Sequence, residues 1–110
     1  MNGNGQFGLS EHDLELVRGI LDAQLRGRPV YVFGSRATGN ARPLSDIDLA
    51  VGGCEPLNLL ERALLKEAFE ESDLPMLVEV LDLNAIAPEF RRRISRDFVA
   101  IQAGKQEVAA

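Results

Sequence analysis

The sequence predicts an α+β domain, α/β-like in character, in which a small mixed β-sheet is packed by helices. Apolar residues recur at helical spacing in three stretches, and short β-branched runs lie between glycines and prolines. The elements follow in the order helix, strand, strand, helix, strand, helix. At 110 residues the chain has room for one small core. We therefore expect one domain over residues 9–102, between a flexible tail at 1–8 and a frayed tail at 103–110.

Composition narrows the function classes. The chain has 12 basic and 17 acidic residues and a net charge of −5 at pH 7, which argues against non-specific nucleic-acid binding. Its one cysteine, Cys54, excludes an internal disulfide and fits a reducing, cytoplasmic location. No apolar run approaches the roughly 20 residues that span a bilayer, so we expect no membrane association.

The first helix is predicted to begin at Ser10, a capping residue followed by acids, and to end near Arg26-Gly27. A second helix is expected over residues 58–71, and a last one from Asn84 or Pro88. The state of the closing apolar segment, residues 98–101, is left open. The residues expected on the buried face of the second helix are Leu60, Ala63, Leu64 and Ala68.

Three strands are predicted at residues 30–33, 46–51 and 77–83. In the second strand, alternation places Asp46 and Asp48 on one face and the apolar residues on the other. Two carboxylates on one apolar strand repel each other unless a cation joins them. Oxygen ligands of this kind suit Mg²⁺. Ser45-Asp46 could instead cap a turn at the start of the strand, but Asp48 lies too far inside the strand for that role.

A turn at Gly34-Ser35 follows the first strand directly. Glycine allows close backbone approach, and a short helix that starts at Ser35 points N–H groups at a bound anion. The Ser35 hydroxyl and Arg36 are further candidate donors. A phosphate site and a carboxylate pair after neighbouring strands together indicate metal-assisted phosphoryl or nucleotidyl transfer.

A third acid is expected on the third strand, which offers Glu79 and Asp82 on opposite faces. Either face can be the core, so strand parity alone does not choose between them. Four arginines, Arg91, Arg92, Arg93 and Arg96, crowd the last helix as a solvated face or as a docking patch for an acidic partner.

These residues resemble a known family. Gly34-Ser35, ten residues, and then Asp46-x-Asp48 is the signature of the DNA polymerase β-like nucleotidyltransferase superfamily. The short length and the sequence around residues 70–75 resemble its smallest branch, the minimal nucleotidyltransferases (MNT), over roughly residues 9–102. The resemblance implies a nucleotidyltransferase core that binds a nucleoside triphosphate at the turn and two Mg²⁺ ions at the acids.

The resemblance also selects the third acid. The run at residues 74–83 places Glu79 where the family usually has Asp, so Asp46, Asp48 and Glu79 are the implied metal ligands and catalytic residues. Glutamate is one methylene longer, which leaves the effect on activity open. Gly34, Ser35 and Arg36 are the implied nucleotide-binding residues.

Small members of the family resemble the antitoxin half of a two-gene module with a helical HEPN-type protein, and some transfer AMP from ATP to a tyrosine of that partner. The chain points the same way, because its one-domain core leaves no segment to enclose an acceptor. A partner or an oligomer must supply it. The alternative is a catalytically weak or inactive binding module that neutralises its partner by occlusion.

Overall fold

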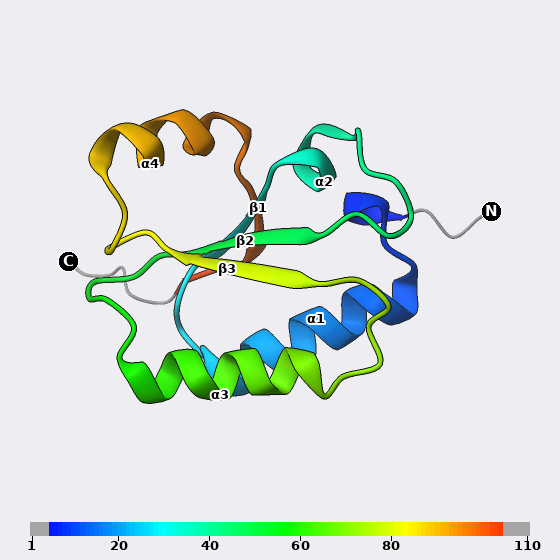
Figure 1. Cartoon of the computed structure of the whole chain (residues 1–110), viewed down its shortest axis with the longest axis horizontal. Helices are drawn as coiled ribbons and strands as arrows, with labels where there is room; N and C mark the ends of the chain where they lie inside the picture. The colour runs from blue at the N-terminus through cyan, green and yellow to red at the C-terminus, as the bar shows by residue number, and fades with distance from the viewer. Residues whose placement is uncertain (1–4, 105–110) are drawn as a thin grey trace.

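A four-stranded mixed sheet forms the centre of the protein, with helices on both faces (Figure 1). The computed structural model describes residues 5–104. The strands lie in the order β3-β2-β1-β4; β1 is antiparallel to β2 and β4, and β2 is parallel to β3. This confirms the predicted fold class. In chain order the elements are η1 (Gln6–Gly8), α1 (Glu11–Gln24), β1 (Val30–Phe33), α2 (Ser35–Thr38), β2 (Ile47–Val51), α3 (Leu59–Glu70), β3 (Val78–Asp82), α4 (Pro88–Ile94), η2 (Ser95–Asp97) and β4 (Val99–Gln102).

The two long helices begin at side-chain caps. The Ser10 hydroxyl accepts a hydrogen bond from the Asp13 N–H at 3.0 Å and so opens α1. Asn58 and Glu61 form a reciprocal capping box that opens α3. Both helices lie on the same face of the sheet (Figure 1), and the core is the apolar layer between them and the strands. Its fully buried strand residues include Val30, Val32, Ile47, Leu49 and Val51.

The predicted buried face of α3 is wrong by about one position. Leu65 and Phe69 are the buried residues of the helix, whereas Leu60 and Leu64 are 66% and 42% exposed. Ala63 is exposed as well, and Ala68 is half-buried. Leucines occupy several sides of this helix, so its apolar residues form overlapping stripes. The stripe that includes Phe69 turns inward because it buries the larger side chain.

The N-terminal segment differs from expectation, and the closing segment takes one of the states left open for it. Residues 6–8, expected to belong to a flexible tail, form η1 and bury the Phe7 side chain against the core. Residues 1–4 and 105–110, which make up the rest of the predicted tails, lie outside the described residues. The closing segment forms β4, which pairs with β1. In the described part of the chain, no helix is long and apolar enough to cross a membrane.

Candidate active site

The turn between β1 and α2 is shaped by its glycine. Gly34 has φ 75° and ψ −152°, a conformation that L side chains rarely adopt. A Cβ at this position would lie 2.6 Å from Oδ2 of Asp48. Gly34 therefore meets two requirements at once, the backbone turn and the close approach of the carboxylate. The backbone N–H groups of Ser35 and Arg36 begin α2 and so have no acceptor within the helix.

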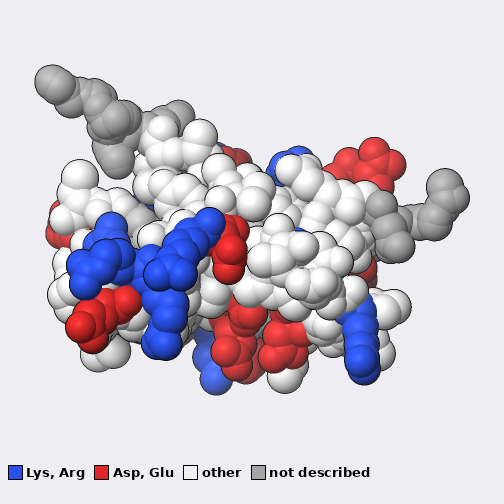
Figure 2. All heavy atoms as spheres, turned by 90° about the horizontal axis from the view of Figure 1, so that it is seen from above, with Lys and Arg blue, Asp and Glu red and all other residues white. Residues whose placement is uncertain are grey.

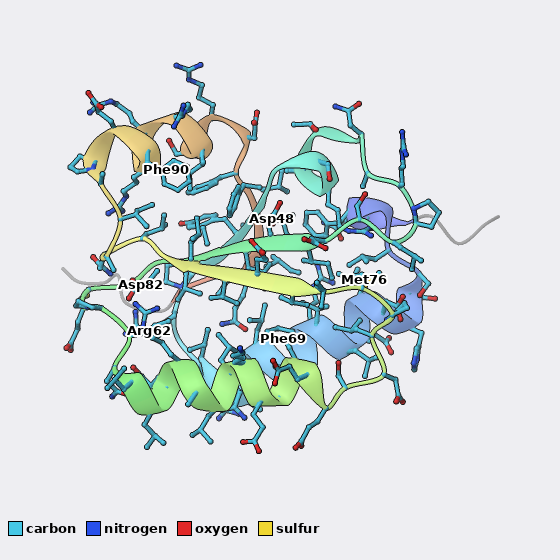
Figure 3. All side chains as sticks on the ribbon, in the orientation of Figure 1. Asp48, Arg62, Phe69, Met76, Asp82 and Phe90 are labelled. Carbon is cyan, nitrogen blue, oxygen red and sulfur yellow. The ribbon has the colours of Figure 1, made fainter. Side chains whose placement is uncertain are left out.

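Strand register brings Asp48 and Glu79 together. Phe33 of β1, Asp48 of β2 and Glu79 of β3 are Cα partners across the sheet and therefore share one face. In Figure 3 Asp48 rises from β2 on the side that carries α2 and α4, away from the core. Asp46 is exposed and lies just before β2, which starts at Ile47 rather than at the predicted Asp46. The turn and the first carboxylates thus meet where β1 ends and β2 begins.

The environment of Asp48 is strongly negative. Partial burial, the neighbouring Glu79 carboxylate and Asp46 together raise the pKa of Asp48 above its ordinary value. In the part of the chain that the structure describes, no group donates a hydrogen bond to this carboxylate. A hard divalent cation would supply the missing positive charge, and the oxygen-only donor set fits Mg²⁺.

Asp48 and Glu79 share one face of the sheet, but the three acids do not form a closed ligand group. Within residues 5–104, no three or more His, Cys, Asp or Glu side chains are close enough together to hold a metal ion. Asp48 and Glu79 are neighbours through strand pairing, whereas Asp46 lies in the loop that precedes β2. A metal site here therefore needs Asp46 to turn toward the strand pair.

Asp82, the other acid of β3, has a structural role. It is 2% exposed and lies on the face of the sheet that packs against α3 (Figure 3). Its Oδ2 accepts a hydrogen bond from the Leu57 N–H at 2.7 Å and faces Arg62 at 3.4 Å, and its Oδ1 accepts one from the Asn84 N–H at 2.9 Å. With both oxygens engaged by the protein, Asp82 is not placed for the metal, and Glu79 is the acid beside Asp48.

The Arg36 side chain does not face the turn; only the Arg36 backbone N–H lies there. Arg36 was expected to bind the nucleotide, but its side chain is buried, with 2% exposed, and points into the protein. Its guanidinium donates only to backbone carbonyls, so it is not available to a phosphate at the turn. The acceptors are the carbonyls of Phe7, Gly8, Arg42, Pro43 and Ser45, at 2.7–3.3 Å.

An aromatic cluster next to Asp48 was missed by the sequence analysis. The rings of Tyr31 and Phe98 stack with centroids 4.8 Å apart and planes 7° apart, and Phe98 also meets Phe33 at 6.2 Å. Tyr31 and Phe33 are two apart on β1, and their shared face with Asp48 follows from strand alternation and register. That alternation was the available signal. The ring that stacks on Tyr31 belongs to Phe98, in the closing segment at residues 98–101, whose secondary structure the sequence does not determine.

Two hollows border this face. Arg92, Arg93 and Arg96 line one of about 340 Å³ with Glu89, and Figure 2 shows the basic side chains gathered over α4. A larger groove, of about 630 Å³, runs between α3 and the edge strand β3. Glu79 is part of its lining at the β3 edge, whereas Asp48 and the turn residues Gly34 and Ser35 are not. Arg62 and Lys66 lie along its α3 side.

Comparison with known proteins identifies the family of the chain. The family model described as Polymerase beta, Nucleotidyltransferase matches residues 17–106. The Haemophilus influenzae protein named Probable protein adenylyltransferase MntA is 40% identical over 108 residues, which cover 98% of this chain and 95% of that protein.

Solved structures share the fold. One described as a minimal nucleotidyltransferase is 35% identical, with a TM-score of 0.63 over 80% of this chain and 92% of that one. Another, described as a tri-AMPylated Shewanella oneidensis HEPN toxin in complex with MNT antitoxin, is 18% identical with a TM-score of 0.64 over 88% and 75% of the two chains. This chain therefore belongs to the minimal nucleotidyltransferases of the polymerase β nucleotidyltransferase family.

Proposed function

We propose that this nucleotidyltransferase moves AMP from ATP to a hydroxyl of a helical HEPN-type protein partner and that the reaction depends on two Mg²⁺ ions. The observation that carries the proposal is the position of Asp48. Its carboxylate packs against Gly34 of the turn and stands beside Glu79, with no protein donor to balance its charge among the described residues. The turn that would bind the triphosphate and the carboxylate that would bind the metal therefore lie side by side.

Each residue has a role in this scheme. The N–H groups at the start of α2 and the Ser35 hydroxyl hold the triphosphate. Asp46, Asp48 and Glu79 hold Mg²⁺, which supplies positive charge to the attacking and leaving oxygens when it is bound. Glu79, on the exposed edge strand, is placed to accept the proton of the acceptor hydroxyl.

The chemical step is an in-line displacement at the α-phosphorus. The acceptor oxygen forms a bond to that phosphorus, and the bond from it to the bridging oxygen of the β-phosphate breaks. AMP remains on the acceptor, pyrophosphate leaves, and the acceptor proton passes to Glu79. The turn aligns the leaving pyrophosphate, because its donors contact the phosphates that leave.

The comparisons support a protein acceptor. The relative that covers nearly the whole chain is named a protein adenylyltransferase, and a structure of the same fold is a complex of an AMPylated HEPN toxin with an MNT antitoxin. Glu79 is exposed on β3, which is an edge strand of the sheet. A hydroxyl on another protein can therefore approach Glu79 from outside.

The test is co-expression with a helical HEPN-type protein, followed by intact-mass analysis of that partner. We expect AMP additions with the wild-type chain and none with the Asp46→Asn/Asp48→Asn double variant. A partner that gains AMP equally with the double variant overturns the proposal.

The same experiment distinguishes AMP transfer from the alternative, in which the chain neutralises its partner by occlusion alone. The absence of a closed three-acid group among the described residues is the observation that favours it. If the double variant still forms the complex and silences the partner, and the wild type adds no mass, the chain acts as a binding module.

A further inference from the structure

Arg36 lies at the junction of three segments that frame the candidate site. It follows Ser35 of the turn directly, and its guanidinium donates six hydrogen bonds to five backbone carbonyls. Two acceptors, Phe7 and Gly8, belong to the N-terminal segment; three belong to the loop that leads into β2. A planar guanidinium with five N–H donors is suited to fix several carbonyls at once.

The bond to Ser45 links the turn to the first carboxylate. The Ser45 carbonyl accepts from Nη2 at 2.7 Å and from Nε at 3.1 Å. Because the peptide unit is planar, fixing this carbonyl also fixes the orientation of the next nitrogen, which belongs to Asp46. Arg36 therefore connects the two parts of the site. It is bonded directly to Ser35, and it is hydrogen-bonded to the carbonyl of Ser45, the residue before Asp46.

The N-terminal segment is shaped for the same guanidinium. Phe7 has φ 61° and Gly8 φ 68°, and Phe7 is the described non-glycine residue with positive φ. A bulky residue in this region is rare and persists where its surroundings hold it. Here the Phe7 ring is buried in the core while the Phe7 and Gly8 carbonyls accept from Nη1, both at 3.1 Å. Both residues precede the family match, which starts at residue 17.

We propose that Arg36 is a positioning residue for nucleotidyl transfer, which sets the spacing between the Gly34-Ser35 turn and Asp46. The Phe7 and Gly8 carbonyls hold its guanidinium in place, and we call this set of hydrogen bonds the lock. The inference rests on the proposed roles of the turn and of Asp46 in holding Mg·ATP. The physical basis is a chelate effect. Mg·ATP contacts the turn through its phosphates and the acids through its metal, and the spacing of these two sites sets the effective concentration for the second contact once the first is made.

The matched control is Arg28, which also donates to backbone carbonyls of a loop, those of Gly52, Glu55 and Pro56. These acceptors follow β2, at the end of that strand away from Asp46. Arg36→Lys and Arg28→Lys each keep the positive charge and lose the fork of donors. Both are expected to lower Tm by a few degrees, on the order of 5 °C.

The decisive measurement is calorimetric binding to the full chain of Mg²⁺ alone, ATP alone, and Mg·ATP. In Arg36→Lys we expect Mg·ATP to bind at least about tenfold more weakly while each single ligand changes less than about twofold. Arg28→Lys should leave all three unchanged. The inference is overturned if Arg36→Lys binds Mg·ATP as wild type does, or if Arg28→Lys weakens it equally.

A second variant leaves Arg36 in place and serves if Arg36→Lys does not fold. A Cβ at Gly8 would lie 3.4 Å from Nη1 of Arg36, in a strained backbone conformation. Gly8→Ala should therefore weaken Mg·ATP binding in the same direction, by about threefold. No change in a folded Gly8→Ala protein removes the N-terminal segment from the lock. These readouts need no acceptor protein, so they stand even if transfer to the partner is not observed.

Discussion

Asp48 and Asp82 are both aspartates on neighbouring parallel strands, yet their surroundings differ in every respect. Asp82 is buried on the α3 face, with backbone donors on each oxygen and Arg62 beside it. Asp48 is half-buried on the opposite face, among acids and without a described donor. A carboxylate whose hydrogen bonds are satisfied by the protein stabilises the fold. One that the protein leaves unsatisfied is available to a ligand.

The largest expected effect comes from Asp48→Asn. Loss of the charge should lower kcat for AMP transfer by at least about 1000-fold, equivalent to about 4 kcal/mol of transition-state stabilisation. The fold should be retained, because no described residue donates to this carboxylate. Transfer kinetics and thermal unfolding of the same preparation check both parts. A variant with undiminished transfer would remove Asp48 from the site.

Asp82→Ala should show the reverse pattern. It leaves the buried N–H of Leu57 without its acceptor, which costs about 2–4 kcal/mol of unfolding free energy. Chemical denaturation measures this loss. Transfer by the folded fraction, assayed at low temperature, should stay within about threefold of wild type. Asp82→Asn, which keeps one acceptor oxygen, is the control and should lose less stability.

Glu79→Gln tests the third acid. It should lower kcat about 10–100-fold, because it removes the proton acceptor and one charged metal ligand. Unfolding should be unaffected, since the side chain is exposed. Glu79→Asp restores the charge on a shorter side chain and is the matched comparison. If Glu79→Gln transfers AMP at the wild-type rate, β3 contributes no acid to the chemistry.

The smallest effect concerns pH. The pKa of Asp48 is raised in the folded protein, so the folded state binds this proton more tightly than the unfolded chain does. Its contribution to stability is therefore present at low pH and is lost as pH rises from its ordinary value of 3.8 through the raised pKa. The Tm of wild type should therefore fall relative to that of Asp48→Asn, whose side chain does not titrate, as pH rises through this window.

Magnesium should reverse that loss at neutral pH. Mg²⁺ binds the charged carboxylate of the folded state, so it should raise the Tm of wild type by about 1–3 °C and leave Asp48→Asn unchanged. An equal rise in both proteins would place the bound Mg²⁺ elsewhere on the chain.

Much of the fold follows from local pattern. The β-branched runs and the caps at Ser10 and Asn58 predicted the strands and the long helices to within a few residues. The spacing of Gly34-Ser35 to Asp46-x-Asp48 predicted the family. What local pattern lacks is the pairing between distant strands. Parity on β3 left Glu79 and Asp82 open, and the residues alone did not choose. The parallel register with β2 places Glu79 beside Asp48.

The contacts of the Arg36 side chain also could not be predicted from local sequence pattern. Its position next to a phosphate turn suggested an anion ligand, because arginine is a common phosphate donor. The carbonyls that it contacts come partly from Phe7 and Gly8, 29 and 28 residues earlier in the chain, and the local sequence does not predict these contacts. The prediction of the buried face of α3 was wrong for a similar reason, because only packing against the sheet determines which of its leucines are buried.

The pairing of β4 with β1 has a consequence for the order in which the strands pair. β1, β2 and β3 all lie within residues 30–82, so the strands that carry Asp48 and Glu79 can pair without β4. β4 closes a loop of about 70 residues onto β1, a slow step for non-local strands. Phe98 arrives with it and covers Tyr31. A chain in which β4 has not yet docked therefore already presents its acidic pair while one edge of the sheet is open.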